Sequence, residues 1–213
     1  MPLNHKNISK IHSTLNNHSQ KAELMVVSKN RSTEDINELL AMGYRLFGEN
    51  RVQEAKIKFQ NLSSSFKDLS LHLIGPLQSN KLRDALKTFH TIQSVDRKKI
   101  VIQIAKYLEK EYLLITKNYF IQINIGAEIQ KSGILLEELD EFYEFCLNHK
   151  LPIKGLMCIP PLNKEPNYYF EKMLKARDTI NPNLKLSMGM SSDYEIALKN
   201  QSDLIRIGSS FFQ

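Results

Sequence analysis

Cysteine is scarce in this chain. Only Cys146 and Cys158 occur among its 213 residues, and neither belongs to a CxxC motif or to a Cys/His spacing that holds zinc. A disulfide framework and a structural zinc site are therefore excluded, and we expect two buried thiols and no metal. The chain is long enough to bury a large core without such cross-links.

Long apolar runs are also missing. No stretch approaches the roughly 20 apolar residues that a membrane-spanning helix needs. The N-terminal segment 1–20 interleaves its apolar residues with Asn, His, Lys and Ser, which is unlike a secretory signal. Hydrophobic residues make up 42% of the chain and charged residues 24%, as in ordinary globular proteins. We predict a globular, cytosolic protein that does not bind membranes.

No basic block is present, although the formal net charge is +6 and the pI is about 9.2. That balance attracts anions in general. Lysines such as Lys98, Lys106 and Lys110 are interleaved with acidic residues, and no aromatic run of the RNA-binding kind occurs. We therefore predict solvated lysines and no nucleic-acid partner. Nucleic-acid binding remains an alternative motivated by net charge alone, and such binding would weaken steeply with salt.

Motifs for nucleotides and for hydrolysis are absent. Neither GxGxxG nor a Walker loop occurs, so a dinucleotide or nucleoside triphosphate site has no support. Of the six histidines, only His72 falls within a predicted strand. We interpret it as a satisfied pocket or core histidine rather than a general base. The acidic run within residues 137–141 is interpreted as a solvated helix face.

What the chain does contain is a regular alternation of short apolar runs with longer segments of helical period, which is typical of βα units and a parallel sheet. The pattern predicts strands over residues 23–29, 44–50, 71–75, 91–95, 119–125, 153–159, 184–188 and 204–207. It predicts helices over residues 7–17, 32–43, 52–62, 81–89, 98–112, 136–147, 168–179 and 193–199.

Several strands are apolar nearly throughout, as in residues 120–125, which favours a parallel sheet covered by helices. Eight such units predict a closed (β/α)₈ barrel in a single domain spanning residues 1–213. The extra helix at residues 7–17 is placed to cover the last gap. A doubly wound open sheet is the structural alternative, since the number of strands alone does not prove closure.

Lys29 is the first candidate for chemistry. In a barrel of this kind the active site lies at the carboxyl ends of the strands, and Lys29 closes the apolar run 24–28. Apolar neighbours would desolvate its amine and free a nucleophilic lone pair. Such an amine forms an imine with an aldehyde or ketone. A solvated lysine at a strand end is the alternative interpretation.

Two later segments are rich in small residues. Residues 186–193 join a strand to a helix, and residues 206–210 end the last strand, where barrels commonly hold phosphate on backbone amides. Either segment could be only a tight turn. A lysine nucleophile opposite a phosphate site suits pyridoxal 5'-phosphate (PLP), which carries both an aldehyde and a phosphate. A lysine-imine aldolase acting on a sugar phosphate is an alternative.

The motifs of the chain resemble those of the pyridoxal-phosphate homeostasis proteins, the YggS and PROSC family. They are VVSK at 26–29, which contains the VSK motif, FGENRVQE at 47–54, HLIGPLQSNK at 72–81, QINIG at 122–126, KSG at 131–133, GLM at 155–157, IPP at 159–161, LSMGMS at 186–191 and RIGS at 206–209. The resemblance covers almost the whole chain. It implies the fold of the N-terminal barrel of alanine racemase, a fold-type III PLP protein.

The resemblance also implies roles for individual residues. Lys29 would carry PLP as a Schiff base, and Arg206 would face the pyridine nitrogen of the cofactor. A permanent guanidinium charge there disfavours protonation of that nitrogen and makes the ring a poorer electron sink. Phosphate contacts would fall on Ser187, Ser191, Gly208 and Ser209, partly through backbone amides. Asn50 would lie near the ring oxygen of the cofactor.

The chain departs from the family pattern in three places. Residues 30–32 read Asn-Arg-Ser where the family often has a threonine and a proline, Arg51 replaces a common tyrosine, and the chain stops at residues 211–213. These differences leave Lys29, Arg206 and the phosphate loops in place. They change the mouth of the expected pocket and the tail.

These features predict a protein that binds PLP and takes part in intracellular PLP (vitamin B6) homeostasis, without a dedicated catalytic activity. We expect no counterpart of the second domain with which alanine racemase closes its site, so water would compete there. PLP-dependent apoenzymes are the expected recipients. The helix faces show no clear self-complementary patch, so we expect a monomer. A PLP-dependent amino-acid racemase is the alternative function.

Overall fold

The computed structural model describes residues 3–18, 21–110 and 113–212, and only the backbone of residues 63–64. Its strands are β1 (Glu23–Val27), β2 (Leu46–Glu49), β3 (Ser70–Leu73), β4 (Thr91–Val95), β5 (Asn118–Ile123), β6 (Ile153–Cys158), β7 (Lys185–Ser187) and β8 (Leu204–Ile207). Its α-helices are α1 (His5–Asn17), α2 (Thr33–Ala41), α3 (Val52–Phe59), α4 (Leu62–Ser65), α5 (Leu82–Thr88), α6 (Lys98–Lys110), α7 (Leu139–Asn148), α8 (Pro166–Ile180) and α9 (Tyr194–Lys199). Three 3₁₀ turns are η1 (Ser79–Lys81), η2 (Leu136–Glu138) and η3 (Ser209–Phe211).

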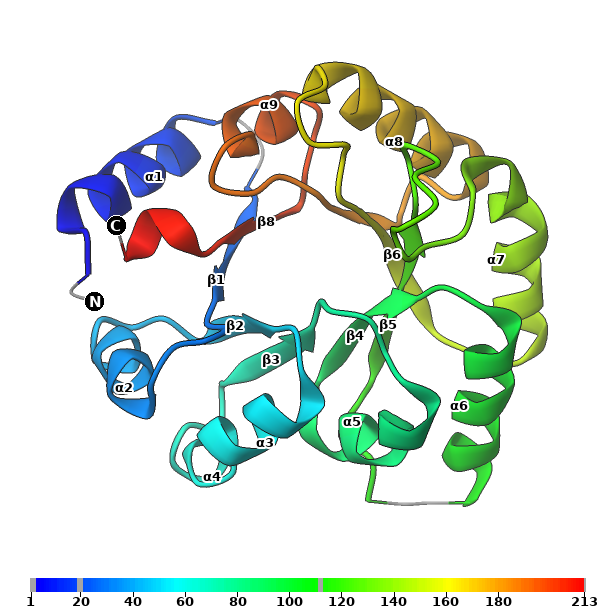
Figure 1. The fold of residues 1–213 in the computed structure, drawn as a ribbon, viewed down its shortest axis with the longest axis horizontal. Helices are drawn as coiled ribbons and strands as arrows, with labels where there is room; N and C mark the ends of the chain where they lie inside the picture. The colour runs from blue at the N-terminus through cyan, green and yellow to red at the C-terminus, as the bar shows by residue number, and fades with distance from the viewer. Residues whose placement is uncertain (1–2, 19–20, 111–112, 213) are drawn as a thin grey trace.

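The strands form a closed barrel in the order β1 to β8, and all of the pairings are parallel. Closure rests on the first and last strands, where Glu23 pairs with Leu204 and Val26 pairs with Ile207. Figure 1 looks along the barrel and shows the helices as an outer ring. The predicted (β/α)₈ barrel is confirmed, and the open doubly wound sheet is excluded.

The N-terminal helix lies where the sequence pattern placed it, beside the end of the chain. Figure 1 shows α1 alongside η3, and the backbone N–H of Asn4 donates to the carbonyl oxygen of Phe211 at 2.8 Å. The Asn4 side chain also caps α1, since its Oδ1 accepts from the N–H of Asn7 at 3.0 Å. This helix therefore covers the seam between the last and first strands.

Several predicted boundaries are wrong, including the ends of the strands predicted over 71–75 and 119–125, which stop at Leu73 and Ile123. β1 ends at Val27 rather than Lys29, because Asn30 takes a left-handed φ of 58° and turns the chain out of the ladder. The predicted helix over residues 52–62 stops at Phe59, and a separate short helix, α4, follows it at Leu62–Ser65. The last two residues of the helix predicted over 98–112 lie outside the described residues.

Alternation along the strands separates two layers of side chains. Outward residues such as Val26, Phe47 and Leu71 join one apolar core with the helices. Inward residues include polar groups, since Ser187 on β7 donates a hydrogen bond to Gln93 on β4 at 2.6 Å. β4 and β7 are not neighbours in the barrel, so this bond crosses its interior. The barrel interior is therefore partly polar.

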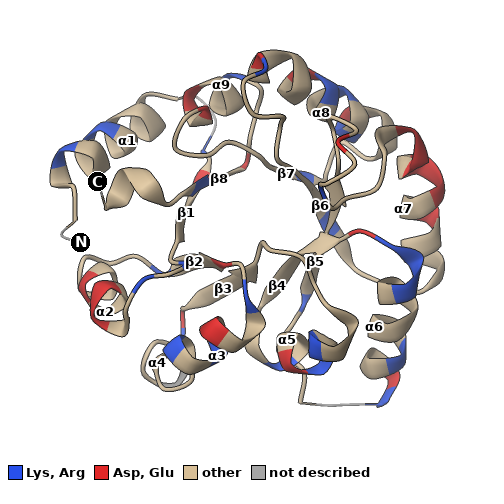
Figure 2. Cartoon of the chain, viewed as in Figure 1, with Lys and Arg blue, Asp and Glu red and all other residues tan. Residues whose placement is uncertain are grey.

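The charges lie mainly on the outside of the ring. Figure 2 shows basic and acidic residues spread over the outer helices, with an acidic run on α7. Glu137, Glu138, Asp140 and Glu141 are all exposed, which confirms the predicted solvated face. Within the part of the chain that the structure describes, no helix is long and apolar enough to cross a membrane.

Candidate functional site

A cavity of about 370 Å³ lies at the carboxyl ends of the strands, and Val27, Ile74 and Ile159 form its apolar wall. Six of the seven residues expected to bind a cofactor line it. They are Lys29, Asn50, Ser191, Arg206, Gly208 and Ser209. These residues come from the segments after β1 and β2, from the β7–α9 loop and from the end of β8, so the barrel brings together positions that are far apart in the sequence.

Lys29 lies two residues beyond the end of β1, in a turn. Its side chain is exposed, although it borders the cavity. The expected enclosure of Lys29 by apolar neighbours is therefore wrong, because the strand ends early and the turn lifts the residue to the rim. The structure instead leaves the amine accessible to a ligand that enters from solvent.

An ionic cluster stabilises the turn that carries Lys29. We define this cluster as Ser28, Glu49, Glu54 and Lys58. The Lys58 ammonium donates to the carbonyl oxygen of Ser28 at 2.7 Å and to Glu49 Oε1 at 3.0 Å. Ser28 Oγ also donates to Glu49 Oε1, at 2.8 Å. Glu49 is fully buried, and this burial raises the pKa of its carboxyl in spite of the neighbouring Lys58 charge.

Glu54 completes the cluster on the other side of the turn. Its Oε1 accepts from Lys58 at 2.5 Å and from the backbone N–H of Asn30 at 2.6 Å. Hydrogen bonds thus join Ser28 to β2 and α3, and join Asn30 to α3. Sequence reasoning missed this cluster. The signal was the pair of glutamates in the FGENRVQE motif, together with Lys58 four residues after Glu54 on α3.

Arg206 is buried inside the barrel with its guanidinium fixed. Nη1 donates to the carbonyl oxygen of Ser187 at 2.5 Å and to Ser187 Oγ at 2.8 Å, and Nη2 donates to the carbonyl oxygen of Cys158 at 2.6 Å. Burial lowers the pKa of Arg206, but a guanidinium stays protonated in proteins. Its Nε–H and one Nη2–H have no acceptor in the described part of the chain, so donors remain for the cavity.

Ser187 lies behind Arg206 and is not among the residues that line the cavity. It is fully buried, accepts from Arg206 and donates to Gln93. Its hydroxyl is therefore occupied inside the barrel. The structure places Ser187 as a support of the guanidinium rather than beside Ser191 and Ser209.

The loop after β7 bends sharply at Gly189. Gly189 has a φ of 93°, and a Cβ there would lie 2.5 Å from the Cβ of Ala197, so only glycine fits without strain. The Asp193 carboxylate holds the loop by accepting from the N–H of Met190 at 2.6 Å. Burial raises the pKa of Asp193.

The loops after β7 and β8 meet at the cavity. The N–H of Ser210 donates to Ser191 Oγ at 3.3 Å, which joins the two loops. Among the described residues, no acceptor takes the backbone N–H of Ser191, Ser192 or Ser209, and all three residues line the cavity. Free amides and hydroxyls on two adjoining loops are suited to bind the oxygens of a phosphate.

Asn50 is positioned by a close crossing of two loops. A Cβ on Gly75 would lie 2.2 Å from the backbone oxygen of Asn50, so the IGP segment after β3 requires glycine there. Asn50 also lines a smaller side cavity of about 200 Å³, which adjoins the first, together with Lys131 of the KSG motif. Lys131 Nζ donates to the carbonyl oxygen of Pro160 at 3.0 Å. The KSG motif therefore forms part of the same mouth of the barrel.

Comparison with known proteins decides the family. A family model described as alanine racemase, N-terminal domain, matches residues 4–213. The chain belongs to this family. It also belongs with the pyridoxal phosphate homeostasis proteins, as the motifs indicated. The relative of that name from Aquifex aeolicus (strain VF5) is 36% identical over 200 residues, which cover 90% of this chain and 86% of the relative. The one from Escherichia coli (strain K12) is 38% identical over 204 residues, which cover 91% and 86%.

Solved structures agree with this assignment. PipY of Synechococcus elongatus PCC7942, solved with PLP bound, matches with a TM-score of 0.80 and 30% identity over 98% of this chain and 99% of PipY. Alanine racemase from Bartonella henselae matches with a TM-score of 0.68 at 16% identity, over 98% of this chain and 58% of the racemase. The second match shows the shared fold alone.

Proposed function

We propose that this protein binds PLP at the cavity between Lys29 and Arg206 and serves intracellular PLP homeostasis. The observation that carries the proposal is the meeting of three groups in one cavity of about 370 Å³: an accessible primary amine, a fixed guanidinium and the free amides of two loops. PLP supplies an aldehyde that condenses with a primary amine. The PLP-bound PipY structure supports the same ligand class.

Each group has a distinct task in this proposal. Lys29 offers the amine for a covalent link, and its turn is kept in place by Lys58 and Glu54. Ser191, Gly208 and Ser209 bind the phosphate through hydroxyls and amides. Arg206 directs a free N–H at the pyridine nitrogen, and its fixed positive charge opposes protonation there.

Two more of the expected residues take different roles. Ser187 positions the guanidinium by receiving its N–H groups, so it acts on the cofactor through Arg206. Asn50 lies near the ring oxygen of the cofactor, on the loop after β2, where it lines the cavity.

Holding and releasing PLP fits this cavity better than racemisation. A racemase needs one acid–base group on each face of its substrate. Of the described residues that line the cavity, Lys29 and Arg206 carry the ionisable side chains, and a buried guanidinium does not give up its proton. We therefore propose a carrier that supplies PLP-dependent apoenzymes in the cytosol. The monomeric state stays a prediction.

A titration with PLP tests the binding site. The purified protein is expected to develop the visible absorbance of lysine-linked PLP in a saturable way, whereas Lys29→Ala is expected to develop none. Lys164→Ala removes an exposed lysine from the loop after β6 and serves as the matched control. Equal absorbance in Lys29→Ala and Lys164→Ala would overturn the assignment of Lys29.

A chirality assay separates the carrier from the racemase. The PLP-loaded protein is incubated with L-alanine or L-serine, and formation of the D-enantiomer is compared with that given by free PLP. We expect no steady turnover above free PLP. Sustained turnover that is lost in Lys29→Ala would replace the carrier by an enzyme at the same site.

A further inference from the structure

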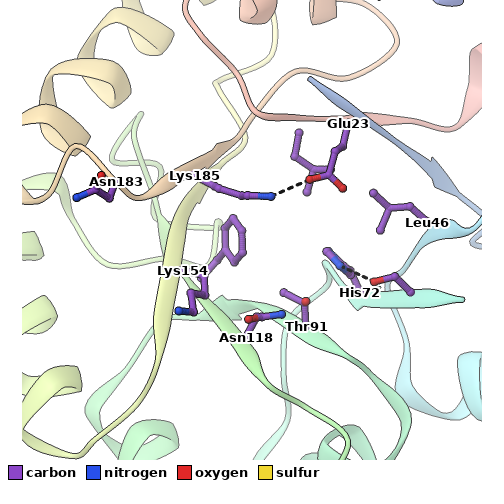
Figure 3. Close-up of a pocket in the computed structure, with 11 residues that line it drawn as sticks. Glu23, Leu46, His72, Thr91, Asn118, Lys154, Asn183 and Lys185 are labelled. Carbon is purple, nitrogen blue, oxygen red and sulfur yellow. Dashed lines mark hydrogen bonds and ion pairs between the residues drawn. The ribbon is translucent and has the colours of Figure 1, made fainter. Parts of the chain in front are cut away.

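The opposite mouth of the barrel contains a second cavity, of about 320 Å³. It is lined by residues with which strands begin, including Ser70 on β3, Thr91 on β4, Asn118 on β5 and Lys185 on β7. Figure 3 shows Thr91, Asn118 and Lys185 around a common space, with His72 on its wall. None of its lining residues borders the cavity that holds Lys29, so the two cavities are separate.

The charges around this second cavity favour an anion. Glu23 is neutralised by Lys185, whose Nζ lies 2.7 Å from Glu23 Oε1, and Figure 3 shows this pair at one side of the space. Lys154 adds a further positive charge to the wall. Within the described part of the chain, the Lys154 ammonium, the Asn118 amide and the Thr91 hydroxyl have no hydrogen-bond partner. One ammonium and two neutral polar groups are thus left for a ligand.

A buried hydrogen-bond chain fixes another donor at the cavity. It begins at Arg206, which has no acceptor atom and therefore must donate to Ser187 Oγ at 2.8 Å. Ser187 Oγ in turn donates to Gln93 Oε1 at 2.6 Å. The Gln93 amide nitrogen then donates to His72 Nδ1 at 2.9 Å. The Gln93 amide oxygen can only accept and its nitrogen can only donate, so the chain has a single direction along the barrel.

The last step of the chain ends at Ser70. Because His72 Nδ1 accepts from Gln93, the ring proton lies on Nε2, which donates to Ser70 Oγ at 3.2 Å. The Ser70 hydroxyl keeps its own proton free, and Ser70 lines the cavity. Burial, with smaller contributions from His90 and Lys185, lowers the pKa of His72 to about 3. The imidazole is therefore neutral near pH 7, and the hydrogen bonds keep the same donors and acceptors at that pH.

We infer that the amino-end mouth of the barrel is a binding site for a small oxyanion, either a carboxylate or a phosphate monoester. Lys154, Ser70 and Asn118 all line this cavity and offer an ammonium, a hydroxyl and an amide as donors, and oxyanions are the ligands that such donors recognise. A volume of about 320 Å³ is at the lower end of the range for small-molecule sites, about 300–1,000 Å³. The site goes beyond the proposed PLP function and does not depend on it.

Amide NMR spectra of the purified protein test this site by titration at constant ionic strength, with inorganic phosphate in one arm and succinate in the other. We expect saturable shifts at Thr91, Asn118 and Lys154 in at least one arm, and the tighter arm identifies phosphate or carboxylate. Lys154→Gln is expected to weaken this binding about fivefold. Ser70→Ala removes a small hydroxyl and is expected to weaken it as well.

Lys117→Gln is the matched control. Lys117 is exposed and precedes Asn118 at the same end of the barrel, but it does not line the cavity. Binding is expected to change by less than about twofold in this variant, because screened charges outside the site contribute little. Shifts that do not saturate in either arm would overturn the site. Equal loss in Lys154→Gln and Lys117→Gln, or saturable shifts confined to residues 189–210, would overturn it too.

Discussion

The two mouths of the barrel are built differently. At the carboxyl ends of the strands, Lys29, Ser191 and Ser209 belong to turns and loops beyond the strands. At the amino ends, Ser70 and Thr91 are the first residues of strands themselves. Loop residues can change without altering the barrel, whereas strand residues share its register and packing. The comparison predicts that substitutions at the first mouth change ligand binding, while substitutions in the barrel wall and its supports change stability.

The largest effect on stability is expected from the ionic cluster under Lys29. Lys58→Met leaves the buried Glu49 carboxylate without its cation, and breaking a buried pair in this way costs about 3–5 kcal/mol. Lys56→Met is the control on the same helix, since Lys56 pairs with Asp84 on the surface at 3.4 Å, and it is expected to cost less than about 0.5 kcal/mol. Urea denaturation measures both. A similar loss of unfolding free energy in the two variants would show that the buried cluster stabilises the fold no more than a surface ion pair does.

Acid is expected to destabilise the barrel through His72. Burial lowers the pKa of His72 to about 3, whereas an unfolded histidine titrates near 6.5. Below about pH 6.5 the unfolded chain takes up a proton that the folded chain does not, so stability falls as the pH is lowered. By about pH 4.5 this histidine accounts for about 3 kcal/mol.

Urea denaturation at about pH 7.5 and about pH 4.5 checks this dependence by comparing the wild type with His72→Gln. The variant is expected to lose much of the difference in stability between the two pH values. Burial also lowers the pKa of His90, and its contribution is common to both proteins. An unchanged pH dependence in His72→Gln would show that another group causes the acid sensitivity.

A substitution at Gly189 tests whether the backbone conformation of the β7–α9 loop determines how well it binds phosphate. Alanine at this position has an unfavourable φ of 93° and a Cβ only 2.5 Å from that of Ala197. Gly189→Ala is expected to cost about 1–3 kcal/mol and to weaken PLP binding, because it displaces the amides of Ser191 and Ser192. Gly43→Ala is the control, because Gly43 has a similar φ of 94°, has nothing within 4 Å of an added Cβ and does not line the cavity. Unchanged PLP affinity in Gly189→Ala would separate the loop geometry from phosphate binding.

The smallest change in stability is expected at the residue that matters most for the ligand. Lys29 is exposed, so Lys29→Ala is expected to alter the free energy of unfolding by less than about 0.5 kcal/mol without PLP. The same substitution abolishes the covalent link to PLP. A large loss of stability in the PLP-free variant would place Lys29 in the structural support of the barrel instead.

The sequence predicted the barrel because its signals are local. Apolar runs mark the strands, and helix ends have local signals too, as where Ser32 caps α2 and its Oγ accepts from the N–H of Asp35 at 3.2 Å. The glycine and serine loops could be placed at one mouth, since the carboxyl ends of parallel strands share an edge. Resemblance to a known family added the ligand and the residue roles.

The remaining features depend on contacts that are distant in the sequence. Ser187 was expected to contact phosphate, but its partner Gln93 lies 94 positions away, and the inward direction of both side chains depends on the closure of the barrel. Lys58 contacts the Ser28 carbonyl 30 positions away. This contact anchors the turn that carries Lys29. No local pattern carries that information.

The most direct measurement for the PLP site is borohydride reduction of the PLP-loaded protein, followed by intact mass and peptide mapping. Reduction makes the lysine–cofactor bond permanent, so the modified residue can be read from the peptide mass. We expect one PLP per chain, on the peptide that contains Lys29. A reduced adduct distributed over several lysines, or found on a single peptide without Lys29, would contradict the proposed site.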